Sequence, residues 1–131
     1  MEVTRNGSQP AKIGGEGNFT GHALRTPLFG AHAPSRMVGG TVTFEAGART
    51  VWHTHPVGQI LIITMGSGKV QSWEGPVVDV SPGDVVRFAP GEKHWHGASS
   101  TSGMSHIAIV EQEKGETTCW LEPVTQAQYT G

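Results

Sequence analysis

Two short histidine motifs dominate the chemistry that this sequence could perform. The first is His-Thr-His at 53–55 with Gln59 four residues after it, and the second is His-Trp-His at 94–96. Residues two apart in an extended strand point to the same side, so each motif would place both imidazoles on one face. If the two strands face each other, several imidazoles and one amide oxygen converge. Neutral nitrogen and oxygen ligands of this kind predict a divalent metal with Lewis-acid or redox chemistry.

Two of the histidines have roles that the residues alone leave open. His96 would point to the same side as His94, as a further ligand, a substrate contact or a group behind the ligands. His106 lies within the apolar run 104–111, on the face that it shares with Ala108. A histidine in a strand is commonly a hydrogen-bonded core residue. The small neighbour would also leave room for a ligand, and a neutral imidazole is a good general base.

The segments that carry these histidines belong to a series of short predicted strands. We expect strands over residues 39–45, 50–55, 59–65, 69–73, 77–80, 85–88, 94–96, 104–111 and 117–121. Turns rich in glycine and proline separate them, and a further strand within 19–29 would be broken by Pro27. Strands of this length and spacing predict an all-β sandwich or barrel.

We expect a single domain over residues 1–131. Residues 1–18 form a polar, glycine-rich arm, and residues 39–111 hold the core motifs. A short helical turn is expected within 123–129, because proline suits a first helical position.

Composition argues against several classes of partner. Nine basic and eleven acidic residues give a formal net charge of −2, with no basic run, so we expect neither nucleic acid nor an anionic membrane as partner. No apolar stretch approaches the roughly 20 residues needed to cross a bilayer, and the first residues lack the pattern of a secretory signal. Cys119 is the only cysteine, so an intrachain disulfide is impossible. We expect a cytoplasmic protein that acts on a small molecule.

The two histidine motifs resemble the paired motifs of the cupin superfamily. The first motif has its usual spacing at Gly47, His53, His55, Gln59 and Gly66. The second is matched at Gly83-Asp84, Pro90-Gly91 and His94, with Ala89 and Ala98 in place of the usual proline and asparagine. This resemblance implies a single-domain cupin fold, which is a double-stranded β-helix or jelly-roll barrel. It also implies that the metal ligands are His53, His55, Gln59 and His94, with Gln59 at a position where most cupins have glutamate.

A closer resemblance extends over most of the chain. Residues 47–56 and 83–97 are similar to small bacterial manganese cupins that include the cupin-type (R)-selective hydroxynitrile lyases. The resemblance implies Mn²⁺ as cofactor, His106 as the acid/base residue and His96 as its neighbour in the pocket. It further implies a substrate cavity lined by Gly40, Val42 and Val110. The reaction would be cleavage and formation of cyanohydrins, for example benzaldehyde and hydrogen cyanide from mandelonitrile.

Alternatives to this function follow from the same residues. The ligands also suit Fe²⁺, Co²⁺, Ni²⁺ or Zn²⁺. An O₂-dependent cupin dioxygenase and a non-catalytic cupin that binds a small ligand are the competing functions, and a histidine cluster without metal is a further alternative. Neutral Gln59 leaves the charge of a divalent ion uncompensated, so that a bound hydroxyl would feel a stronger Lewis acid than beside a carboxylate.

Alternation within the strands also bears on assembly. Ile60 and Ile62 would flank an inward set formed by Gln59, Leu61 and Ile63. Strands that are apolar on both faces predict a covered outer surface, so we expect a homodimer or homotetramer. Trp52 and Trp95 alternate with the histidines and should point away from the metal, whereas His22 and His32 should lie at the surface.

Overall fold

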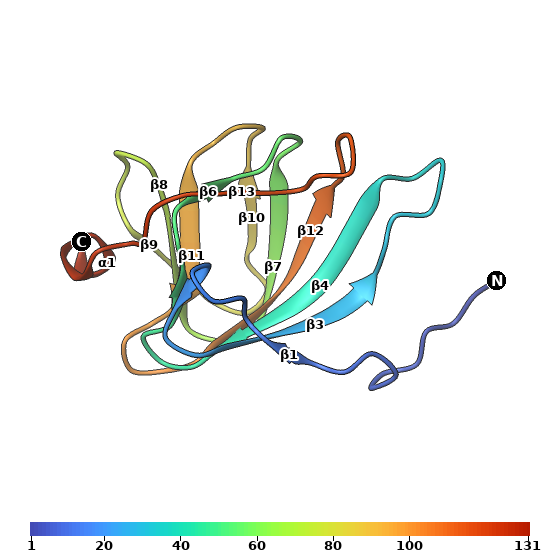
Figure 1. The fold of residues 1–131 in the computed structure, drawn as a ribbon. Coiled ribbons are helices and arrows are strands. Elements are labelled where there is room, and N and C mark those ends of the chain that lie inside the picture. The colour runs from blue at the N-terminus through green and yellow to red at the C-terminus, as the bar shows by residue number, and fades with distance from the viewer.

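A computed structural model describes all residues, Met1–Gly131, as two curved antiparallel sheets that face each other (Figure 1). The six-stranded sheet has the order β1 (Lys12–Ile13), β3 (Ala23–Phe29), β4 (Met37–Phe44), β12 (Met104–Glu111), β7 (Gln59–Gly66) and β10 (Val85–Phe88). The seven-stranded sheet has the order β13 (Cys119–Trp120), β6 (His53–Thr54), β11 (His94–Ala98), β5 (Arg49–Thr50) and β2 (Phe19–Thr20). Its two remaining strands are β8 (Gly68–Ser72), which pairs with β11, and β9 (Val78–Val80), which pairs with β8.

The structure corrects the predicted strands in two places. β3 runs through Pro27 with only a register shift before Phe29. Because β1 pairs only with Leu24 and Arg25, β3 is an edge strand at Pro27, where proline is tolerated. The strand predicted over residues 50–55 is divided into β5 and β6. At the division Trp52 turns to the C-terminal segment, where its backbone N–H donates to the carbonyl oxygen of Glu122 (2.9 Å).

The two ends of the chain are more ordered than the sequence suggested. The arm, residues 1–18, contributes β1 to the six-stranded sheet. The only helix, α1 (Gln126–Thr130), starts later than predicted and begins with a capping box between Thr125 and Gln128. No helix has the length and apolarity needed to cross a membrane.

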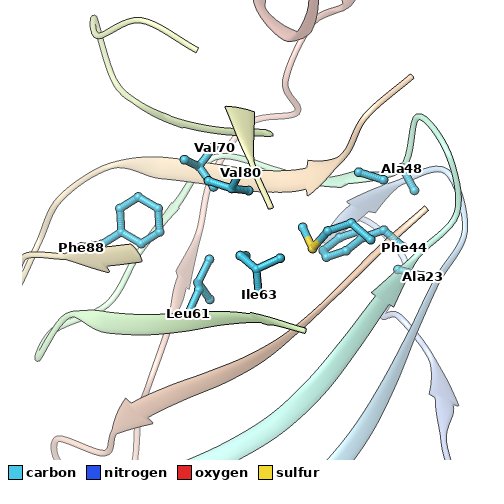
Figure 2. Packing of buried hydrophobic residues seen from close by; sticks show 10 residues of the cluster. Ala23, Phe44, Ala48, Leu61, Ile63, Val70, Val80 and Phe88 are labelled. Carbon is cyan, nitrogen blue, oxygen red and sulfur yellow. The ribbon is translucent and has the colours of Figure 1, made fainter. Parts of the chain in front are cut away.

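The main core fills the space between the sheets at one end of the barrel. Along β7, Gln59, Leu61 and Ile63 are buried and the isoleucines between them are half-buried, as strand alternation predicts. Figure 2 shows Leu61 and Ile63 directed toward Val70 and Val80 of the opposite sheet. This contact between the sheets fixes their separation, and thereby the space in which the histidines lie.

A second, smaller core lies on the other side of the seven-stranded sheet. It joins Trp52 and Trp95 to Val124 and to Tyr129 of α1. The Tyr129 hydroxyl donates to the carbonyl oxygen of Ala98 in β11 (2.6 Å). The two tryptophans therefore pack away from the main core, and α1 supports β11, the strand that carries the second histidine motif.

Candidate metal centre

The two histidine motifs, distant in sequence, are brought together by the pairing of β6 with β11. His53 and His94 are directly opposite each other, and their ring centroids are 4.3 Å apart. His55 follows just after β6, with its ring centroid 5.0 Å from that of His53 and 5.3 Å from that of His94. All three imidazoles are buried.

Each of these three imidazoles is held by a backbone carbonyl through Nδ1. His53 donates to Val51 (2.8 Å), His94 to Glu92 (2.7 Å) and His55 to Thr117 (2.8 Å). A carbonyl oxygen only accepts, so Nδ1 of each ring carries the proton and Nε2 presents a lone pair. Metal-binding histidines are typically fixed in this way by a partner on their other nitrogen.

Gln59 reaches the same place from β7 of the opposite sheet. Its Oε1 lies 3.1 Å from Nε2 of His94, although neither atom carries a proton in this tautomer. Two acceptors at this distance need a cation between them or a rotated amide. A cation would also use Nε2 of His55, which is buried without a hydrogen-bond partner. The residues present therefore fit a divalent metal.

His96 and His106 form a hydrogen-bonded pair beside this group. Nε2 of His106 and Nδ1 of His96 are 2.9 Å apart, and both rings are buried. The other nitrogens, Nε2 of His96 and Nδ1 of His106, have no partner. Potential ligand nitrogens of His53, His94 and His96 lie within 4.8 Å of one another. By this distance His96 stands in the group in place of His55, which the cupin resemblance assigns to the metal.

Burial sets the protonation state of the whole cluster. Loss of hydration lowers the pKa of His94 to about 4 and that of His106 to about 4. Burial also lowers the pKa of His53, His55 and His96, and for His53 and His96 the repulsion of neighbouring histidines adds to the effect. All five imidazoles are therefore neutral at pH 7, and a metal can bind without first displacing a proton.

Aromatic rings that sequence reasoning missed enclose the cluster. Phe88 stacks on His94 with 3.6 Å between ring centroids, and Trp120 lies against His53 at 4.9 Å. Trp120 reaches this position because β13 pairs with β6, which places it opposite His53. Nothing in the local sequence indicates that pairing. Phe88 was recognisable as an inward position of β10, but its contact with His94 depends on the register between distant strands.

The residues expected in the substrate cavity lie on the inner face of the six-stranded sheet. Val42 pairs with His106, Gly40 with Ala108, and Val110 with Gln59. All three are half-buried. Two surface cavities, of about 510 and 410 Å³, are lined by other residues, so the role of these three positions stays a prediction.

The histidines expected at the surface, and the cysteine, lie outside the cluster. His22 and His32 are exposed, and His22 lies 3.5 Å from Glu45. Cys119 is a free, exposed thiol on β13.

Fold and site together define a small antiparallel β-barrel protein. Its interior holds a group of buried histidines, among them His53, His94 and His96, that is suited to a divalent metal. The sequence pattern of the cupin domain matches residues 40–110, and the chain belongs to the cupin family. The prediction of an all-β, single-domain cupin fold is thereby confirmed.

Individual relatives agree with this assignment. An (R)-mandelonitrile lyase from Granulicella tundricola is 52% identical over 98% of both chains. The crystal structure of a cupin-like protein from Thermotoga maritima superposes with a TM-score of 0.84, at 36% identity over 98% of this chain and 95% of that one. A polyketide cyclase from Streptomyces resistomycificus shares the fold alone, with a TM-score of 0.75 at 16% identity over 98% and 90% of the two chains.

Proposed function

We propose that this protein is a metal-dependent hydroxynitrile lyase that cleaves and forms cyanohydrins such as mandelonitrile. The observation that carries the proposal is the near-full-length similarity, at 52% identity, to a protein named (R)-mandelonitrile lyase. The cluster of neutral, buried imidazoles supports it, because the reaction needs a Lewis acid and a base but no redox step.

His53, His55, Gln59 and His94 would hold the metal, with Mn²⁺ as the proposed ion. Three fixed Nε2 lone pairs and one amide oxygen provide its ligands. A bound divalent ion supplies Lewis-acid chemistry, which lowers the pKa of a hydroxyl group placed beside it. None of the four residues carries a negative charge that would weaken this effect.

The His96–His106 pair would move the proton. In one tautomer Nε2 of His96 offers a lone pair, and a proton taken there passes through the 2.9 Å hydrogen bond to His106. When the pair takes the hydroxyl proton of a cyanohydrin, the oxygen electrons form the carbonyl and the carbon–carbon bond breaks. Cyanide leaves with the bonding electrons, and the same pair returns the proton to form hydrogen cyanide. In this relay His96 contacts the hydroxyl group and His106, the proposed base, accepts the proton through His96.

Gly40, Val42 and Val110 would bind the organic part of the substrate. The first lacks a side chain, and the other two are apolar and half-buried. Gly40 is paired with Ala108, Val42 with His106, and Val110 with Gln59. An aryl group lying on this face would have its reacting carbon near the histidine pair.

We further propose that the protein is a homodimer or homotetramer in the cytoplasm. Ile60, Ile62, Ile107 and Ile109 form two cross-strand pairs on the outer face of the six-stranded sheet, and each is half-buried in the single chain. Sheets that pack face to face bury such surfaces. The same apolar face on a second copy of the protein is the proposed partner of this surface.

Metal analysis of the purified protein and an anaerobic mandelonitrile assay test the proposed function. We expect Mn²⁺ in the protein and release of benzaldehyde under argon, with loss of activity after chelation and recovery on adding Mn²⁺. The His106→Ala variant should lose the activity, and His32→Ala, which changes an exposed histidine, should keep it. Turnover that requires oxygen would contradict the lyase and favour a dioxygenase.

A further inference from the structure

The register of the six-stranded sheet aligns two basic side chains with the base of the proposed reaction. His106 is paired with Val42, Val42 with Arg25, and Arg25 with Lys12. These four residues form one cross-strand row over β12, β4, β3 and β1, which are successive neighbours in the sheet (Figure 1).

Arg25 and Lys12 lie on the inner face of the sheet. Ala23 is buried in the main core, and Arg25, two residues further along β3, shares its side. Residues directly opposite each other in an antiparallel pair also share a side, so Lys12 faces the same way. Two strand spacings separate Arg25 from His106, which is roughly 10 Å between their backbones. A substrate of the size of a substituted benzene ring could contact both.

The two cations have no acidic partner. Like charges directly opposite in an antiparallel pair are destabilising. The ion pairs of the structure join Lys69 to Asp79 and Lys93 to Glu122, and involve neither Lys12 nor Arg25. The other members of their row are uncharged, and the proposed metal ligands include no carboxylate. Both residues are exposed, so water rather than an acidic side chain faces the two charges, and a ligand carboxylate could bind them directly.

We propose that Lys12 and Arg25 form a carboxylate subsite for the substrate. The inference rests on the proposed function and extends it to a substrate class: aromatic cyanohydrins and aldehydes that carry a carboxylate on the side of the ring away from the reacting carbon. The guanidinium of Arg25 would bind the carboxylate in a bidentate manner, with the Lys12 ammonium as a second donor. Gly40 and Val42 would contact the ring between the two ends.

A pair of substrates that differ only in charge tests this subsite. They are the cyanohydrins of 4-formylbenzoate and of its methyl ester, assayed with the Mn²⁺-loaded protein. Arg25→Gln and Lys12→Gln remove one cation each, and Arg87→Gln is the matched control, because Arg87 is exposed on β10 of the same sheet in register with outward-facing Ile60.

We expect Arg25→Gln to lower kcat/KM for the carboxylate substrate about tenfold, mainly through KM, because one charge-assisted hydrogen-bonded contact is lost. The Lys12→Gln variant should show a smaller loss in the same direction. The methyl ester should change by less than about twofold in every variant, and Arg87→Gln should resemble the wild type with both substrates. Equal loss with both substrates, or no loss with the carboxylate, would overturn the subsite.

Calorimetric binding of 4-formylbenzoate without cyanide separates this inference from the lyase function. If neither cyanohydrin is cleaved but Arg25→Gln weakens binding of 4-formylbenzoate and not of its methyl ester, the subsite stands and the proposed reaction is wrong. If mandelonitrile is cleaved and 4-formylbenzoate binds equally well to the wild type and Arg25→Gln, the reaction stands and the subsite is wrong.

Discussion

Acidification of the metal-free protein should destabilise it well before its carboxylates titrate. The pKa of His94 and that of His106 are each lowered from 6.5 to about 4 in the folded state, chiefly by burial. An unfolded chain exposes both imidazoles and binds protons from pH 6.5 downward. Because the unfolded state binds more protons between pH 6.5 and 4, the free energy of unfolding must fall as the pH falls through this window.

The magnitude follows from the two pKa values of each histidine. At pH 5, a group with a pKa of 6.5 when unfolded and about 4 when folded destabilises the protein by about 2 kcal/mol relative to pH 7. His94 and His106 together account for about 4 kcal/mol, a large part of the roughly 5–15 kcal/mol typical of a domain. The lowered pKa values of His53, His55 and His96 act in the same direction.

Urea unfolding followed by tryptophan fluorescence, at pH 7 and pH 5 with a chelator present, measures this difference. The His106→Gln variant should reduce the pH dependence by about 2 kcal/mol, whatever its stability at pH 7, because one of the titrating groups is gone. The His32→Gln variant changes an exposed histidine and should keep the full dependence. Equal free energies of unfolding at pH 7 and pH 5 in the wild type would refute the reasoning.

Three substitutions extend these tests. Gln59→Glu should retain the metal but slow mandelonitrile cleavage, because the added negative charge weakens the Lewis acid; unchanged or faster metal-replete kinetics would contradict this. Ile62→Lys on the half-buried outer face should shift the protein toward monomer in size-exclusion chromatography with light scattering, whereas Val78→Lys, an exposed position on β9, should not. Leu61→Ala should lower the free energy of unfolding by about 2–5 kcal/mol in urea titrations, since Leu61 is fully buried between the sheets; a loss below about 1 kcal/mol would show that the core relaxes around it.

The shared face of the two imidazoles within each histidine motif was predictable from the sequence because it depends on local facts. Alternation within a strand fixes which side chains share a face, and turn residues mark where strands end. This was enough to expect an all-β sandwich or barrel. The nearness of His53 and His94 depended on which strands face each other, and the resemblance to cupins implied it. It also placed Trp52 and Trp95 on the side away from the histidines.

Pairing between distant segments could not be read in this way. Trp120, which contacts His53, and the Thr117 carbonyl, which accepts a hydrogen bond from His55, belong to a segment that joins the sheet more than sixty residues after the first motif. Alternation fixes the face of a residue but not its partner strand or register. Pro27 was misjudged for the same reason, because its effect depends on whether β3 has a neighbour at that position.

The hydrogen bonds from the histidines to backbone carbonyls determine which positions of this protein can be substituted without altering the metal centre. His53 and His94 each donate to the carbonyl of the residue two positions earlier, so the backbone itself sets the direction of their lone pairs. Side chains of the opposite sheet that do not contact the histidines can be exchanged without disturbing that geometry. His55 differs, since its anchor is Thr117 in the C-terminal segment. New substrates can therefore evolve by substitutions at positions such as Gly40 and Val42 on the inner face of the six-stranded sheet, whereas changes near Thr117 would alter the metal centre itself.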